Sequence, residues 1–331
     1  MLEEPGPWGT NAFILKSGVS TLEKRSPEVV LEANPSYWNP ERRPKVKQVV
    51  FDNIIGREEA IDLVSNTEGK IDIVTEITPA EAAKVEKSKY ARVVRNDAKT
   101  VLVGVFNQMK PNSKWTDIRS RKALNHAVDR NAVVATAARG YGTVIPAMIV
   151  PGAFGYNPEL KPYAFDPAQA KKLMKEAGLQ DGAKVTIVAG EPYRGVVEAI
   201  AKSLGSIGLS VNPVYADAPK GDDWDIWLVE HFDWSPEFPA GVVYREFFGK
   251  DGAFRKVKED STFAQMYSKI LATTNQALQA KQVQQIEKYV YDQANVLFLY
   301  APARLYAVSK RVNFVPYKTT MLELADVTIV K

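Results

Sequence analysis

One stretch between Trp115 and Gly140 indicates the fold of this chain, and it reads WTDIRSRKALNHAVDRNAVVATAARG. Asp117 predicts a helix start, because its carboxylate can accept hydrogen bonds from the free N–H groups of the first turn. The stripe that follows has three- and four-residue spacing, which is typical of one helix face. Asp129 predicts a second helix start, and Gly140 is suited to end that helix in a left-handed conformation. Two consecutive, packed helices are therefore predicted here.

Strands and helices alternate in the residues before this stretch. Thr78-Pro79 followed by Glu81 predicts a helix start, because it combines a capping box with proline in the first turn. The predicted strands cover residues 13–15, 29–33, 49–51, 70–74 and 101–106, and the predicted helices cover residues 58–66 and the segment after Thr78. This alternation is typical of a mixed α/β lobe.

A second alternation follows the stretch. Asp166 and Pro167 predict a helix start, and Gly178 predicts the end of that helix. Further helices are predicted at residues 195–204 and 275–292, and strands at residues 185–188, 211–215, 225–229, 296–300 and 305–308. The fold class is therefore predicted to be α/β. Two lobes are expected, because 331 residues exceed one typical core.

The lobe boundaries are predicted where a hydrophobic strand runs into polar residues and proline. Asn107–Pro111 follows the strand at 101–106 and is the first predicted crossover, and Ala301–Ala303 is the second. Residues 1–107 and 303–331 would then form the first lobe, and residues 108–302 the second. We expect a hinge at these two points.

Composition excludes several classes of protein. The 43 basic and 39 acidic residues are interspersed, so the net charge of +4 gives no nucleic-acid-binding patch. No run of about 18 uncharged apolar residues is present that would predict a membrane span. The chain has no cysteine, which excludes disulfides and thiolate metal sites and fits an oxidising compartment. Residues 1–10 lack the pattern of a signal peptide, so we expect either a cytoplasmic protein or a sequence that is not the whole precursor.

Catalytic, metal-binding and cofactor-binding motifs are not found in the sequence. His126 and His231 are the only histidines, and neither lies in a metalloprotease or triad pattern. Glycine-rich phosphate loops and the nucleophile-elbow pattern do not occur. We therefore predict no catalytic residue, no metal site and no cofactor.

Aromatic residues cluster after the predicted strand at 225–229. Three of the six tryptophans, Trp224, Trp227 and Trp234, lie here together with His231, Phe232 and Asp233. Aromatic rings beside a carboxylate, past the carboxyl end of a strand, are suited to binding an amphipathic cation. Alternatively, the tryptophans pack the two faces of a buried strand. Both interpretations remain open from the residues alone.

The order of residues adds a resemblance to a family. Asp-x-Arg-x-Arg-x-Ala-Leu-x-x-Ala-x-Asp-Arg, at residues 117–130, resembles a signature of the bacterial extracellular solute-binding proteins of family 5, the dipeptide-, oligopeptide- and nickel-binding components of ABC importers. The segments at residues 9–13, 31–38, 69–74 and 165–178 are also similar to family motifs. The resemblance implies a two-lobed periplasmic-binding fold of class II type with a hinge. It also implies an incomplete first lobe, because the Gly9-Thr10 motif normally lies well inside the chain.

The resemblance implies a function and a ligand site. Such a protein captures a small solute between its lobes, such as a peptide or another amine-bearing compound, and passes it to a membrane permease in the periplasm or another extracytoplasmic space. Asp233 matches the aspartate that pairs with the ligand's α-amino group in peptide-binding relatives. The predicted ligand-binding residues are Asp233, Trp234, Phe232, His231, Asn107 and Gln108.

Other functions and partners also stay open at this stage. The same fold serves sensor or regulatory modules, and it can support an enzyme. Alternatively, this chain is a C-terminal fragment that is unable to bind ligand alone. We further expect that the first lobe exposes strand edges around 13–15 and 49–51. Such edges would favour a dimer or a separate N-terminal fragment as partner.

Overall fold

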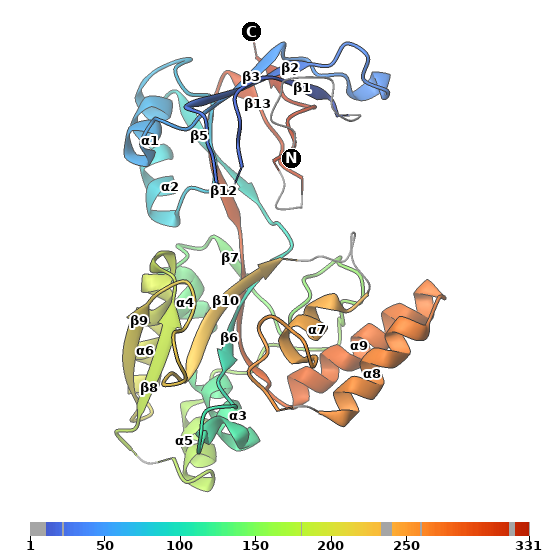
Figure 1. Ribbon diagram of the computed structural model, residues 1–331. Helices are drawn as coiled ribbons and strands as arrows, with labels where there is room; N and C mark the ends of the chain where they lie inside the picture. Colours follow the sequence, from blue (N-terminus) through green and yellow to red (C-terminus); the bar gives the residue numbers. More distant parts are fainter. Residues whose placement is uncertain are drawn as a thin grey trace. The chain divides into compact units, whose positions relative to one another are not determined.

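The chain divides into two compact units. A computed structural model describes residues 11–21, 23–179, 181–232, 240–258, 260–317 and 322–330 (Figure 1). Unit 1 comprises the described residues of Met1–Asn96 and Arg304–Lys331, and unit 2 those of Asp97–Ala303. Within the described ranges, no helix combines the length and the apolar character needed to cross a bilayer.

Unit 2 is built on a six-stranded sheet with the strand order β7-β11-β6-β10-β8-β9. Its strands are β6 (Thr100–Phe106), β7 (Gly142–Val144), β8 (Lys184–Ala189), β9 (Ser210–Tyr215), β10 (Ile226–Phe232) and β11 (Val296–Pro302). β8 is parallel to β9 and β10, whereas β6 is antiparallel to β10 and β11. All seven residues of β6 are buried, because both of its faces are covered.

Helices cover both faces of this sheet (Figure 1). They are α3 (Ile118–Ala127), α4 (Arg130–Thr136), α5 (Pro167–Glu176), α6 (Arg194–Gly205), α7 (Val242–Phe248), α8 (Ser261–Ala272) and α9 (Gln276–Asp292), with short 3-10 turns η2 (Lys114–Thr116) and η3 (Glu191–Tyr193). Leu124 of α3 and Ile200 of α6 pack with Leu102 on one face. Phe247 of α7 and Val283 of α9 pack with Val103 on the other. The result is a three-layer α/β/α unit.

The predicted helix starts are confirmed. The carboxylate of Asp117 accepts a hydrogen bond from the Arg119 amide, and Asp129 caps α4 through the Ala132 amide. Asp166 caps α5 through the Gln169 amide, with Pro167 in the first turn, as these two residues predicted. Gly140 does not end α4, because that helix stops at Thr136. Gly140 instead takes a φ of 82° in the following turn.

Asn125 and Arg130 hydrogen-bond the edge of β11 that β6 does not cover. The Asn125 amide donates to the Val296 carbonyl at 3.0 Å and accepts from the Phe298 amide at 3.2 Å. Arg130 Nε donates to the Phe298 carbonyl at 2.6 Å. β7 pairs with β11 only from Tyr300 to Pro302, so these two side chains replace a neighbouring strand over the rest of the edge. Burial lowers the pKa of Arg130 to about 10, which leaves it charged at neutral pH.

Arg121 holds the carboxyl end of α9 in place. Its guanidinium donates to the carbonyls of Gln293 and Ala294, the two residues that follow α9, and to the carbonyls of Trp115 and Thr116 in the η2 turn. A cation is favourable at this position, because the carboxyl end of a helix carries partial negative charge. Arg121 and Arg130 of the stretch at residues 115–140 are therefore buried structural groups.

Unit 1 contains smaller sheets and two helices. Its elements are β1 (Phe13–Ser17), β2 (Glu28–Ala33), η1 (Pro40–Arg42), β3 (Gln48–Asp52), α1 (Arg57–Asn66), β4 (Ile73–Val74), α2 (Pro79–Val85), β5 (Ala91–Asn96), β12 (Arg304–Ser309), β13 (Val312–Asn313) and β14 (Thr328–Ile329). The sheet orders are β1-β2-β3, β4-β12-β5 and β13-β14. The predicted capping box of Thr78 and Glu81 is present in α2. Val50 and Phe51 of β3 are exposed.

The compact units do not divide at residue 107. Asn107 is buried inside unit 2, where its amide nitrogen donates to the carbonyls of Asp222 and Trp224. The polar run after β6 therefore turns back onto the same sheet instead of leaving it, which corrects the first predicted crossover. The units separate between Asn96 and Asp97 and between Ala303 and Arg304. Within unit 2 the two connecting segments run side by side, since the Thr100 hydroxyl donates to the Pro302 carbonyl at 3.1 Å.

Replacing Arg130 by methionine is expected to lower the free energy of unfolding by about 3 kcal/mol. The change removes the Arg130 donor from the Phe298 carbonyl and one of the two donors from the Asn125 side-chain oxygen, and a buried group left unsatisfied costs about 1–3 kcal/mol. Part of this loss of stability is offset, because methionine removes the free-energy cost of burying a charged group. Urea unfolding followed by circular dichroism measures the difference. Arg119→Met is the control, because Arg119 is exposed and its ion pair is with Asp117, two residues away on the surface. Equal stability of the two variants would contradict the structural role of Arg130.

Glu287 of α9 is expected to make stability depend on pH. Its carboxyl group accepts from the amides of Ile149 and Asn157, and burial raises its pKa from 4.5 to about 8. The folded chain therefore favours the protonated form. This contribution is fully present below about pH 4.5 and is lost as the pH rises through about 8, at no more than about 1.4 kcal/mol per pH unit.

Unfolding of Glu287→Gln at pH 5 and pH 8.5 tests this dependence. The variant should lose less stability than the parent chain over that interval, because its amide cannot ionise. Glu159→Gln, at an exposed position, should follow the parent chain. Parallel pH curves for the parent chain and Glu287→Gln would contradict the raised pKa.

Candidate functional site

The parallel part of the unit 2 sheet contains a topological switch point. From β8 the chain passes through α6 to β9 on one side, and it then returns through β10 on the other side of β8. The connections at the carboxyl ends of β8 and β10 therefore diverge. Open α/β sheets bind ligands in the crevice that forms outside the carboxyl ends at such a point. We name the residues 189–194 and 230–232 the carboxyl edge.

The carboxyl edge combines a carboxylate with aromatic hydroxyl groups. Glu230, two residues before the end of β10, accepts a hydrogen bond from the hydroxyl of Tyr193 in η3. Glu230 and Tyr300 both lie opposite Leu102 in the sheet, so they flank β6 on the same face. Burial, with the Glu230 carboxylate nearby, raises the pKa of Tyr300 and keeps it a neutral hydroxyl group.

The only cation that we place at this edge from the described residues is Arg194, at the start of α6. Its guanidinium forms two hydrogen bonds with Glu191, at 2.8 and 3.0 Å, and lies 3.8 Å from the centre of the Tyr215 ring. These contacts hold Arg194 on its own helix turn. The Glu230 carboxylate is thus the negative group that the sheet itself positions at this edge.

The predicted site residues His231 and Phe232 lie at the end of β10, on opposite faces. Phe232 has 43% of its surface exposed. His231 is buried, and its ring meets the edge of the Phe247 ring at 5.2 Å between centres. His231 therefore packs into the layer beneath α7. Asp233 and Trp234, the other two residues predicted at this end, lie outside the described residues.

Asn107 and Gln108 do not join this group, which corrects that part of the predicted site. β6 and β10 are antiparallel, with Phe232 opposite Thr100 and Ile226 opposite Phe106. The residues that follow β6 therefore lie beside the amino end of β10, about 20 Å from its carboxyl end at roughly 3.3 Å per residue. Two ends of one strand pair cannot form a single small-molecule site.

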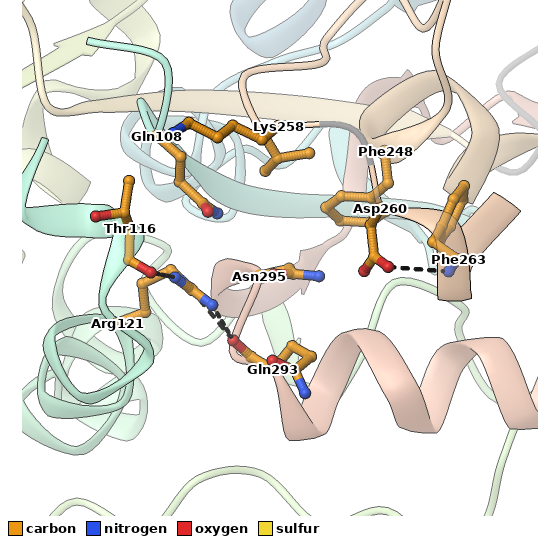
Figure 2. A pocket seen from close by; sticks show the side chains of 10 residues that line it. Gln108, Thr116, Arg121, Phe248, Lys258, Asp260, Phe263, Gln293 and Asn295 are labelled. Carbon is orange, nitrogen blue, oxygen red and sulfur yellow. Dashed lines mark hydrogen bonds between the residues drawn. The ribbon is translucent and has the colours of Figure 1, made fainter. Parts of the chain in front are cut away.

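Gln108 instead lines a cavity of about 280 Å³ at that opposite end (Figure 2). The cavity, named here the Gln108 cavity, is lined by Gln108, Thr116, Arg121, Phe248, Val257, Lys258, Asp260, Phe263, Gln293 and Asn295. Figure 2 shows Thr116 and Arg121 on one side and Phe248 and Phe263 on the other. All ten residues belong to unit 2.

Neither feature was predicted from the sequence. Glu230 offered a usable signal, because the alternation of β10 places it on the same buried face as Ile226 and Leu228, where a charge is unusual. The Gln108 cavity offered none, since its lining comes from six separate segments of the chain. Among the described residues, no group of three histidine, aspartate or glutamate side chains is placed to hold a metal ion.

Comparison with known proteins identifies the family. Residues 3–253 match the sequence profile of the bacterial extracellular solute-binding proteins, family 5 middle region. The chain belongs to this family. It is 26% identical over 304 residues to heme-binding protein A of Haemophilus influenzae, covering 87% of this chain and 53% of that protein. It is 26% identical over 216 residues to the dipeptide-binding protein of Escherichia coli, covering 63% and 38%. The chain thus spans about half the length, or less, of these family 5 relatives.

Solved structures confirm the predicted fold class. The ABC transporter substrate-binding protein CtaP of Listeria monocytogenes superposes with a TM-score of 0.82 at 18% identity, covering 98% of this chain and 67% of that one. The periplasmic binding protein DppA of Helicobacter pylori, in complex with the peptide STSA, gives a TM-score of 0.76 at 19% identity, covering 98% and 63%. At these identities the likeness is one of fold, the α/β fold of family 5 binding proteins.

Proposed function

We propose that this chain is the solute-binding part of an ABC-type importer. Outside the cytoplasm, it captures a small solute, such as a peptide or another amine-bearing compound. It then delivers the solute to a membrane permease. The observation that carries the proposal is the match to family 5 over residues 3–253. The topological switch point of unit 2 supports it, because a crevice at the carboxyl ends of β8 and β10 is where this class of sheet binds ligands.

The charge at the carboxyl edge favours a cationic group on the solute. Glu230 is half-buried beside the rings of Tyr193 and Tyr300. A carboxylate shielded from water keeps more of its Coulomb attraction than one in bulk solvent. Asp233, one residue past the end of β10, would add a second carboxylate, and it matches the amine-binding aspartate of peptide-binding relatives. We propose that Asp233 binds the ammonium group while Glu230 increases the negative potential of the edge.

Aromatic side chains would supply the apolar part of the site. Phe232 is exposed over 43% of its surface at the end of β10, although large apolar side chains are normally buried. A bound solute would cover this ring. We propose that Trp234 also packs against the solute, since aromatic rings pair well with ammonium groups and with apolar chains. His231 contributes packing beneath the site and no direct contact.

Binding without catalysis is the role that these residues support. The carboxyl edge has a tyrosine hydroxyl and a carboxylate, but the ring of His231, the histidine of this edge, packs against the Phe247 ring. A general base must reach the group that it deprotonates. The family 5 relatives and the solved structures named above are likewise described as binding proteins.

Calorimetry with the dipeptide Ala-Ala and its N-acetylated form tests the proposal on the 331-residue chain. Ala-Ala should bind, and acetylation should weaken binding at least tenfold because it removes the positive charge. Asp233→Asn should weaken Ala-Ala binding about ten- to hundredfold, since a charged hydrogen bond contributes about 1.5–3 kcal/mol. Glu230→Gln should weaken it less.

Asp292→Asn is the matched control, because Asp292 is an exposed residue of α9 that pairs with Lys288. Its affinity for Ala-Ala should equal that of the parent chain. Equal affinity for the free and the acetylated dipeptide would contradict the amine assignment. Unchanged binding by Asp233→Asn would contradict the residue assignment alone, and absence of saturable Ala-Ala binding would contradict a peptide as the solute.

A further inference from the structure

The Gln108 cavity has no part in the proposed solute site. It lies past the end of β6, beside the η2 turn and the carboxyl end of α9, whereas the carboxyl edge lies at the other end of the same strands. Its volume of about 280 Å³ far exceeds the roughly 30 Å³ that one water molecule occupies in the liquid. The cavity can therefore hold several waters or one small organic molecule.

Two side-chain amides in the cavity have hydrogen-bonding capacity that the described residues do not use. Gln108 Nε2 is buried and has no partner among them. Asn295 also lines the cavity, and its side chain forms no hydrogen bond with the described part of the chain. A buried donor without an acceptor costs stability, so an acceptor supplied from outside the chain is favoured here. Figure 2 shows both amides directed toward the same space as the Asp260 carboxylate.

The charged groups of the lining favour an anion. Arg121 Nη2 uses one N–H on the Gln293 carbonyl, which leaves its second N–H available. Lys258 is exposed and forms no ion pair with a described residue. Asp260 opposes these charges, but its oxygens already accept from the amides of Thr262 and Phe263 and from the Tyr289 hydroxyl at 2.6 Å. The described lining therefore has two cations and one carboxylate that is occupied as the cap of α8.

One wall of the cavity is apolar. Phe248, Val257 and Phe263 are all buried, and Figure 2 shows the two phenylalanines across the cavity from Arg121. A ligand that satisfies both sides must be amphipathic, with an anionic head and a short apolar tail. Small-molecule sites commonly combine an apolar wall with a few polar groups of this kind.

We propose that the Gln108 cavity is a second ligand site, which binds a small monocarboxylate with a short apolar tail. The carboxylate accepts from Gln108 and Asn295 and is attracted by Lys258 and Arg121, and the tail packs on Phe248 and Phe263. The site is independent of solute capture at the carboxyl edge.

Three probes of the same shape and different charge test the site: isovalerate, isovaleramide and isopentylamine. Each is titrated into the 331-residue chain, with binding followed by saturation-transfer NMR of the probe methyl groups. Isovalerate should bind saturably, and at least tenfold more tightly than the amide or the amine. Gln108→Leu and Lys258→Gln should each weaken isovalerate binding about tenfold, which corresponds to one charge-assisted hydrogen bond.

Matched controls separate loss of the site from a general loss of charge or polarity. Gln276→Leu and Lys281→Gln change exposed residues of α9 that do not line the cavity, and both should bind isovalerate as the parent chain does. A cavity that holds only water would show no saturable binding of isovalerate, which would overturn the proposal. Equal binding of the three probes, or binding unaffected by both cavity variants, would also overturn it. Neither result depends on whether Ala-Ala binds.

Discussion

The architecture of unit 2 depends on how the buried edge of β11 satisfies its backbone hydrogen bonds. β7 covers only the end of this edge, and an unpaired amide or carbonyl inside a protein is costly. Asn125 and Arg130 provide the missing partners from the end of α3 and the start of α4. Because both side chains must reach β11 at fixed points, they determine how the two helices lie on the sheet. Asn125 also accepts from Arg130, so the two groups hold each other in position.

Fixing the sheet in this way gives unit 2 two chemically different ends. At the carboxyl ends of β8 and β10, the chain presents Glu230 with the hydroxyl of Tyr193, a negative edge suited to a cation. At the other end, Arg121 is held by the carboxyl end of α9. Together with Lys258, it gives the lining of the Gln108 cavity its positive charge. The antiparallel pairing of β6 with β10 separates the two ends. One sheet can therefore serve two ligands of opposite charge without competition between them.

The errors at Asn107 and Gln108 share a cause. Asn107 follows a hydrophobic strand and precedes Pro111, a pattern that also occurs where a chain leaves a lobe. In the structure, its side-chain amide instead donates to the carbonyls of Asp222 and Trp224 in the same unit. Gln108 was assigned to the ligand site with His231, yet the strand register places them at opposite ends. α7 and α8 were not predicted, and the 3-10 and short strand elements were missed as well. Asn107 and Gln108 bind partners more than a hundred residues away, whereas α8 packs on the neighbouring α9.

The sequence by itself determined the local features of this protein. Asp117, Asp129 and Asp166 start helices because a cap requires only the next three residues, and the order of strands and helices indicated the α/β class. The order of residues within the motifs also indicated the family. Only the tertiary structure decided which residues meet: that Arg121 and Arg130 are buried, that Glu230 faces Tyr193, and that the chain divides at Asn96. Those outcomes follow from strand register and burial, which are set by contacts between distant segments and not by any short stretch of sequence.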